Sequence, residues 1–362
     1  MQTESLIPLD VAAPALAGSA ATRRGRTMRS PKWLPLGLFA LAVTACDSLS
    51  PSDPGNLVPR TVAEDATLPA IEMNGSRFHL ETFGNPTNPV IVILHGGPGN
   101  DYRSLLRLSE RFNGYSLTDD YFVVYWDQRG CGLSERVSKD ELTIETYVND
   151  LNTIVNRYSP TRPVYLIGES WGGMFATRYI NDFPQRVAGA VLIEPGPLDG
   201  VTAERIKDDW FDMSLGSEWL NDLVWNSQFI SPDDHARMDF ERMLGVKDAQ
   251  PRFHENHVNP APIWRLGAAA SKYITEDGQD SKGRFSYDFT TNLRAFTTPV
   301  LFIAGSLSEV LGESLQRTQI QRYPSASLKV VNGVGHDVAW IKTAEVLTHV
   351  RQYLDARRGG VR

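Results

Sequence analysis

The chain has 362 residues, of which 41% are hydrophobic and 22% charged, the balance of a soluble globular protein with a substantial core. Its length fits one large domain or two smaller ones. The formal net charge is -7 and Lys and Arg cluster only near the amino terminus, which excludes the basic surface of a nucleic-acid-binding protein. Neither a metal-ligand cluster nor a cofactor motif occurs, so we expect no metal and no cofactor.

The first segment of the chain is organised like a signal peptide. Basic residues gather between Arg23 and Lys32, and an apolar stretch follows over residues 33–45. That stretch is shorter than the about 20 residues that a membrane-spanning helix needs. A complete signal begins at Met28, so we interpret residues 1–27 as lying upstream of an alternative start.

The apolar stretch ends in Val43-Thr44-Ala45-Cys46, which resembles the lipobox of bacterial lipoproteins. The resemblance implies that residues 1–46 are a signal segment and that Cys46 carries a lipid. The protein would then be anchored to a membrane of the cell envelope, facing the periplasm or the exterior. An ordinary secretory signal cut near Ala45 is the alternative.

Residues 47–66 are rich in Ser, Pro, Asp and Gly without an apolar period, which predicts a flexible tether. Beyond Ile71, short apolar runs alternate with helical patterns. This alternation predicts a mainly parallel sheet with helices on both faces. The expected strands are residues 78–83 (at an edge), 90–94, 121–126, 164–167, 187–193, 299–304 and 328–331, and the expected helices are residues 143–158 and 171–182.

The strand rhythm breaks between residues 198 and 292. That segment has helical patches, several Trp residues, and more acidic than basic side chains. We interpret it as a helical cap inserted over the carboxyl ends of the strands. Residues 67–197 and 293–362 then form the core of the fold.

Gly168-Glu169-Ser170-Trp171-Gly172 has the G-x-S-x-G pattern and stands between a predicted strand and a predicted helix. A nucleophile elbow requires this context, because the glycines permit a sharp strand-to-helix turn that presents the Ser hydroxyl. The amino end of the helix also stabilises negative charge that forms there. We therefore predict that Ser170 is the nucleophile.

A glycine-rich loop, His95-Gly96-Gly97-Pro98-Gly99, directly follows the predicted strand 90–94. Its glycines leave backbone N–H groups free to face an oxyanion. We predict an oxyanion hole formed by the N–H groups of Gly97 and Trp171. His95 lies on the strand side of the loop and is predicted to be structural.

Gly333-Val334-Gly335-His336-Asp337 follows the last predicted strand. A His in such a loop can take the proton of Ser170, so we predict that His336 is the general base. The remaining His residues, His79 among them, are expected at the surface or in the cap.

The order nucleophile, acid, His is that of α/β-hydrolases. With the segment Trp126-Asp127-Gln128-Arg129-Gly130-Cys131-Gly132-Leu133-Ser134, these motifs resemble the prolyl aminopeptidase (proline iminopeptidase) branch of that superfamily over about residues 75–199 and from 299 onward. The resemblance implies the α/β-hydrolase fold with a mostly parallel sheet, helices on both faces and an inserted helical cap. It also implies a serine hydrolase of small acyl-linked substrates, often with an amino-terminal Pro residue. Cys131 matches the family's Cys and is predicted to be a buried structural thiol.

The triad acid departs from the family pattern. The resemblance places it at the fourth residue of a Gly-x-x-Asp loop after strand 299–304, where this chain has Ser308 followed by Glu309. An acid is needed because the second ring N–H of the His must be held and the imidazolium stabilised. We predict that Glu309 is this acid. Glu194, at the end of the preceding strand, is the alternative, and Asp337 is poorly placed because it adjoins His336.

Three functions are open at this point. The first is an aminopeptidase acting on short peptides, since carboxylates of the acidic cap could receive a substrate ammonium. The second is a carboxylesterase or a related hydrolase of small esters, amides or lactones, which suits the Trp-rich cap. The third is a non-catalytic lipoprotein that binds a ligand in a former hydrolase pocket, which the missing acid at Ser308 favours. The sequence does not give an oligomeric state.

Overall fold

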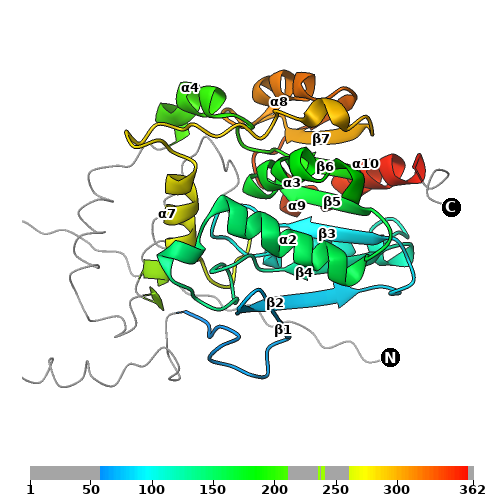
Figure 1. Ribbon diagram of the computed structural model, residues 1–362. Coiled ribbons are helices and arrows are strands. Elements are labelled where there is room, and N and C mark those ends of the chain that lie inside the picture. Colours follow the sequence, from blue (N-terminus) through cyan, green and yellow to red (C-terminus); the bar gives the residue numbers. More distant parts are fainter. Residues whose placement is uncertain (1–57, 211–234, 237, 241–260, 358–362) are drawn as a thin grey trace, which may run out of the picture. The chain divides into compact units, whose positions relative to one another are not determined.

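The structure is a computed structural model that describes residues 58–210, 235–236, 238–240 and 261–357 (Figure 1). The predicted signal segment with Cys46 and nearly half of the predicted cap (residues 211–234, 237 and 241–260) lie outside these residues, so the proposed domain limits stay predictions. No helix in the described ranges is both long and apolar enough to cross a membrane.

An eight-stranded sheet forms the centre of the fold, in the order β1-β2-β4-β3-β5-β6-β7-β8. The pairs β1–β2 and β2–β4 are antiparallel, and every other neighbouring pair is parallel. All seven predicted strands are present. The edge position predicted for residues 78–83 is wrong, because β2 lies between β4 and a further strand, β1, that was not predicted. The strands are β1 (Ala70–Met73), β2 (Ser76–Phe83), β3 (Val90–Leu94), β4 (Phe122–Trp126), β5 (Val164–Glu169), β6 (Val187–Ile193), β7 (Val300–Gly305) and β8 (Ala326–Val331).

Helices cover both faces of the sheet, which confirms the predicted α/β-hydrolase architecture (Figure 1). The side chains of β3 divide between two cores. Val90, Val92 and Leu94 pack with α2 and α3, whereas Ile91 and Ile93 pack with α10 and the short helix η2. The helices are η2 (Arg103–Ser109), α2 (Ile144–Tyr158), α3 (Trp171–Asp182), α4 (Gly200–Trp210), α7 (Ala268–Asp277), α8 (Glu313–Gln319), α9 (Val338–Ile341) and α10 (Thr343–Asp355).

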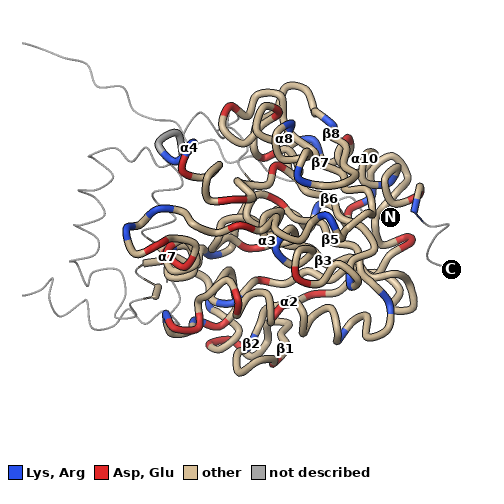
Figure 2. The backbone as a smooth tube through the Cα atoms, turned by 45° about the horizontal axis from the view of Figure 1, so that its top comes forward, with Lys and Arg blue, Asp and Glu red and all other residues tan. Residues whose placement is uncertain are grey.

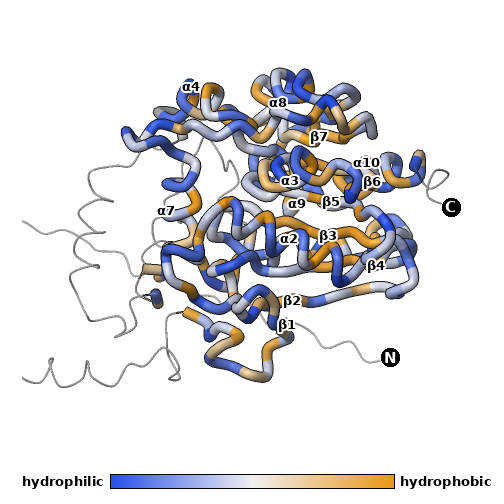
Figure 3. Tube along the Cα trace, viewed as in Figure 1, coloured by the Kyte–Doolittle hydropathy of each residue, from blue (hydrophilic) through white to orange (hydrophobic). Residues whose placement is uncertain are grey.

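The continuous apolar runs of the central strands follow from this burial on both faces. Figure 3 shows the centre of the sheet as its most hydrophobic part, with hydrophilic residues on the covering helices. Acidic and basic residues are interspersed along the described chain rather than gathered by sign (Figure 2).

The segment before β1 corrects the predicted tether. Residues 58–66 were expected to be flexible, but Val58 and Val62 are only 3% and 0% exposed. The N–H of Val62 donates to the carbonyl of Leu133 at 2.8 Å, and the guanidinium of Arg265 donates to the carbonyl of Pro59 at 2.9 Å. Residues 58–66 are therefore not part of a flexible tether.

The chain between β6 and β7 holds the described parts of the predicted cap, including α4 and α7. α7 packs against the core through Ala269, Ala270 and Ile274. The described insert therefore contains helices, as predicted, although residues 278–292 after α7 are not helical.

Candidate active site

Ser170 lies at the sharp turn between β5 and α3. Its backbone has φ 53° and ψ -119°, in a region that residues with a side chain seldom adopt. The turn is held by hydrogen bonds: the N–H of Ser170 donates to the carbonyl of Ile193 at 2.9 Å, and its own carbonyl accepts from Gly173 at 3.0 Å. Strained backbone of this kind is typical of functional sites. This is the geometry of the nucleophile elbow that the motif predicted.

Both glycines of the motif are required by the packing of this turn. A Cβ at Gly168 would lie 2.2 Å from the carbonyl oxygen of Gly172. A Cβ at Gly172 would lie 2.0 Å from the carbonyl oxygen of Leu94, at the end of β3. Only glycine therefore lets α3 approach the strands closely enough to present Ser170 at the edge of the sheet.

The glycine-rich loop at 95–99 lies directly beside the elbow. A Cβ at Gly96 would be 3.2 Å from the Cβ of Ser170. Gly97 has φ +117°, a conformation that its neighbours enforce, because a Cβ there would lie 2.5 Å from the N of Gly99. Trp171 is the first residue of α3, and the N–H groups of a first helical turn have no partner within the helix. The structure thus places the loop that contains Gly97 beside the elbow that contains Trp171, and the role of their N–H groups as oxyanion donors stays a prediction.

His95 is buried at 0% exposure and has a structural environment. Its Nε2 accepts from the backbone N–H of Gln128 at 3.0 Å, and its Nδ1 lies 2.9 Å from the carbonyl of Gly96. Burial lowers the pKa of His95. The side chain of Gln128 continues the network, since its Oε1 accepts from the indole N–H of Trp171 at 2.9 Å. His95 therefore positions the loop beside the elbow, as predicted.

His336 pairs with a buried carboxylate. Its Nδ1 lies 2.7 Å from Oε2 of Glu194, a residue with 0% exposure that follows β6 directly. The second oxygen of Glu194 accepts from the N–H of Gly305 at 2.6 Å, and the N–H of Glu194 donates to the carbonyl of Ile303 at 2.8 Å. The carboxylate is thus fixed between the ends of β6 and β7, with both oxygens occupied.

The prediction that Glu309 is the partner of His336 is wrong. Glu309 is exposed and lines a surface hollow of about 510 Å³ together with Arg205 and Val310. The reason is the course of the loop after β7. It turns alongside the His loop, where the N–H of Leu307 donates to the carbonyl of Val334 at 3.0 Å. This turn buries Ser308 and leaves the next residue, Glu309, facing outward.

Charges around His336 favour its protonated form. Burial alone would lower the pKa of His336, but the hydrogen bond and charge of Glu194, with the charges of Glu169 and Asp337, raise it to about 9. Burial raises the pKa of Glu169 to about 7, against the opposing effect of His336. Glu169 was not predicted to be part of the site, although its position directly before Ser170 would have been enough to indicate it.

Two other predictions concern buried side chains. Cys131 is a free thiol with 0% exposure, as expected, and burial raises its pKa to about 12, which makes it a poor nucleophile. His79, expected at the surface or in the cap, is instead 2% exposed, and its Nδ1 lies 2.8 Å from Oδ2 of Asp127. The surface prediction for His79 is therefore wrong, because β2 is covered on the face that bears this side chain.

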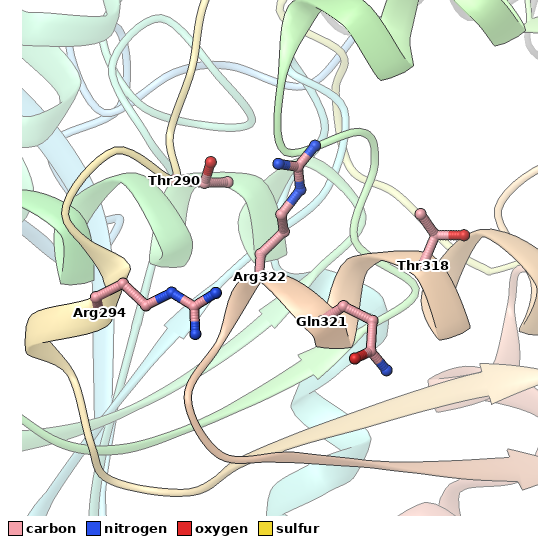
Figure 4. A pocket seen from close by; sticks show the side chains of 5 residues that line it. All are labelled: Thr290, Arg294, Thr318, Gln321 and Arg322. Atoms are coloured by element: carbon pink, nitrogen blue, oxygen red, sulfur yellow. The ribbon is translucent and has the colours of Figure 1, made fainter.

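A second surface hollow, of about 400 Å³, contains neither Ser170 nor His336 (Figure 4). Two guanidinium groups, those of Arg294 and Arg322, enter it from η6 and η7, two short helices at Leu293–Ala295 and Ile320–Arg322. Arg322 is paired with Asp199 at 2.6 Å. The other residues that line this hollow are Thr290, Thr318 and Gln321. Among the residues that the structure describes, no group of three His, Cys, Asp or Glu side chains is arranged to hold a metal ion.

Comparison with known proteins agrees with this geometry. A family model described as alpha/beta hydrolase fold matches residues 89–343. The chain belongs to this family. Its relatives include the proline iminopeptidase of Lactobacillus acidophilus, 34% identical over 276 residues that cover 74% of this chain and 90% of that protein. The proline iminopeptidase of Lactobacillus helveticus is 23% identical over 290 residues, again with 74% and 90% covered.

Solved structures share the fold at lower identity. The proline iminopeptidase of Mycobacterium smegmatis matches with a TM-score of 0.56 and 18% identity, covering 80% of this chain and 98% of that one. A putative lipase from Acinetobacter baumannii matches with a TM-score of 0.58 and 15% identity, covering 80% and 91%. This α/β-hydrolase is therefore a serine-type hydrolase by family, with proline iminopeptidases among its homologues.

Proposed function

We propose that this α/β-hydrolase is an aminopeptidase that releases an amino-terminal Pro residue from short peptides through an acyl-enzyme on Ser170. The observation that carries the proposal is the pair of His336 and the buried Glu194, 2.7 Å apart, beside a strained elbow that presents Ser170. The homologous proline iminopeptidases give the substrate class. The carboxyl groups of Glu169 and Asp337 act on the same His336, and their negative charge favours a substrate with a free ammonium group.

In the proposed mechanism, Oγ of Ser170 attacks the carbonyl carbon of the scissile amide. Its proton passes to Nε2 of His336, whose Nδ1–H stays bonded to Glu194. The oxyanion accepts hydrogen bonds from the N–H groups of Gly97 and Trp171. The imidazolium then protonates the leaving amine, the C–N bond breaks, and an ester to Ser170 remains. Water attacks this ester with His336 as base, which releases the acid and restores the Ser hydroxyl.

Paired substrates test the substrate class. The enzyme is expected to cleave a Pro arylamide with a free amino group at least tenfold faster, in kcat/KM, than the N-acetylated compound. Tenfold corresponds to about 1.4 kcal/mol in the barrier. The reason is that acetylation removes the positive charge that the carboxyl groups near His336 attract. Steady-state assays with the purified protein measure this ratio of the two kcat/KM values.

Ser170→Ala assayed in parallel gives the background for both compounds. A tenfold preference for the acetylated compound, or for simple esters, would replace the aminopeptidase by the carboxylesterase or lactonase alternative. No turnover of any substrate, with Ser170 intact, would instead favour the ligand-binding lipoprotein.

We also propose that the enzyme is anchored to a membrane through a lipid on Cys46. The lipobox-like segment Val43–Cys46 supports this proposal, and the segment lies outside the described residues. Cys46→Ser is expected to move the protein from the membrane fraction to the soluble or unprocessed fraction. Cell fractionation with mass measurement of the mature amino terminus tests it, and Cys131→Ser is the matched control. An unchanged distribution and an unchanged terminal mass would contradict lipidation.

A further inference from the structure

Asp101 is a buried carboxylate two residues after the glycine-rich loop, and the proposed mechanism does not use it. It is 2% exposed and stands directly before Tyr102 and η2. Within the described parts of the chain it forms no ion pair. A buried carboxylate without a cation must be satisfied by hydrogen bonds, so its donors indicate its role.

Backbone N–H groups satisfy Asp101 on both oxygens. Oδ1 accepts from the N–H of Arg103 at 3.0 Å, next to the loop. Oδ2 accepts from the N–H of Trp264 at 2.5 Å and from the N–H of Arg265 at 3.1 Å. These two donors belong to the chain that returns from the cap toward α7, here called the cap-return segment (residues 263–268). One side chain thus joins two parts of the chain that are more than 160 residues apart.

Two further hydrogen bonds flank Asp101 along the same junction. The N–H of Gly267 donates to the carbonyl of Gly99, the last residue of the glycine-rich loop, at 2.7 Å. The guanidinium of Arg103 donates to the carbonyl of Ile263 at 2.8 Å. The junction is also tight, because a Cβ at Gly99 would lie 2.7 Å from the carbonyl oxygen of Gly267. The loop therefore cannot shift without the cap-return segment.

The cap-return segment is held on its other side by Asp239, a described residue of the cap with 0% exposure. Oδ2 of Asp239 is 2.7 Å from Nε of Arg265, and its Oδ1 accepts from the N–H of Ala268 at 2.9 Å. Asp239 also pairs with Arg136 at 3.0 Å. The contacts therefore run without a break from Asp239 through the cap-return segment to the glycine-rich loop. Asp101 is the last side chain in this series.

We propose that Asp101 is a positioning residue that ties the cap-return segment to the glycine-rich loop and so holds the N–H of Gly97 in place for the oxyanion. The inference rests on the proposed role of Gly97, and it adds a connection through which the cap affects catalysis. The carboxylate form accepts three N–H groups, which suits its negative charge.

The charge of Asp101 depends on pH near neutrality. Burial and the charge of Asp127 raise its pKa to about 7, against three backbone hydrogen bonds that lower it. Asp127 is itself paired with His79 at 2.8 Å, and it faces Asp101 across Gly132. A pKa above that of a solvent-exposed Asp means that the closed junction binds the proton more tightly than an opened one. Low pH therefore stabilises the closed junction, and its stability falls as the pH rises through about 7.

Asp101→Asn tests the proposal through the rate at which a fluorophosphonate labels Ser170, a reaction that needs the elbow and the oxyanion donors but no peptide substrate. At pH 8 the variant is expected to react on the order of 10-fold to 100-fold more slowly, because a small displacement of a catalytic donor has this effect. Equal labelling at pH 8 would overturn the proposal.

Hydrogen exchange measures the tie itself and is independent of catalysis. Exchange at residues 263–268 should be faster in Asp101→Asn than in the wild type at pH 8, and wild-type exchange, after correction for the intrinsic rate, should rise as the pH rises through 7. Asp277→Asn is the matched control, because Asp277 accepts from the N–H of Ile144 at 2.8 Å at the far end of α7. If Asp101→Asn does not fold, Arg103→Gln removes the neighbouring bond to Ile263 and should give the same local change. Unaltered exchange in a folded variant would overturn the proposal, whether or not Ser170 is labelled. Absence of any labelling at Ser170 would instead count against the proposed function.

Discussion

Ser170→Ala is expected to lower kcat by on the order of 10⁶, the effect of removing the nucleophile of a triad enzyme. The hydroxyl is the only group at the elbow that can form the acyl-enzyme. Its loss should leave the fold unchanged, because the turn is held by backbone hydrogen bonds and not by the side chain. Turnover, fluorophosphonate labelling and thermal unfolding of the variant measure these effects together.

Ser308→Ala is the matched control for this experiment. Ser308 is also a buried Ser near the His loop, but its Oγ has no hydrogen-bond partner among the described residues. Its removal should leave kcat near the wild-type value. Labelling that persists in Ser170→Ala would show that the nucleophile is another residue.

Glu194→Gln is expected to lower kcat by roughly 10³ to 10⁴, because the amide keeps the shape of the side chain but not its charge. Oε2 of Glu194 is the acceptor that fixes the Nδ1–H tautomer of His336 and stabilises the imidazolium. Its hydrogen bond and charge also raise the pKa of His336. Since the neutral ring is the base, the acid limb of kcat/KM against pH should move to lower pH in the variant. Steady-state kinetics over a range of pH values measures both effects.

Glu309→Gln is the control for Glu194→Gln, and little change in kcat is expected because Glu309 is exposed. If Glu309→Gln lost activity and Glu194→Gln did not, the acid would be supplied by a different arrangement of the loop after β7 than the one described. Near-neutral results for both variants would mean that His336 works without a charged partner.

The sequence was sufficient for those parts of the site that local chemistry determines. The apolar run of β5 and the glycines around Ser170 define the elbow, because no other residue fits at Gly168 or Gly172. The conformation of the glycine-rich loop at 95–99 was predictable for the same reason. Here the pattern of residues and the backbone conformation are directly linked, and no knowledge of distant contacts is needed.

The triad acid could not be chosen from the sequence because the choice depends on how two strands end. Glu194 follows β6 with φ 41°, and the N–H of Gly305 at the end of β7 fixes its carboxylate. Glu309 is only one residue from the family's usual position, but the burial of Ser308 turns it outward. A shift of one residue along the chain changes the direction in which the side chain points, and this direction decides which acid reaches His336.

The segment at residues 58–66 was misjudged for a related reason. Its buried residues, Val58 and Val62, form no periodic pattern, and its partners are Leu133 and Arg265, which are far along the chain. Local composition resembles that of a linker, but long-range contacts hold the segment in place. His79 is a similar case, since its burial depends on the neighbours of β2 and on Asp127.

The buried thiol of Cys131 makes the molecule suited to spectroscopy. The chain has two Cys residues, and Cys46→Ser leaves Cys131 alone, with 0% exposure and a thiol that stays protonated at neutral pH. A maleimide dye would therefore react only with a Cys introduced at a chosen surface position. Pairs of dyes, one on α7 and one on α10, could then measure the distance between these two helices during turnover without background labelling.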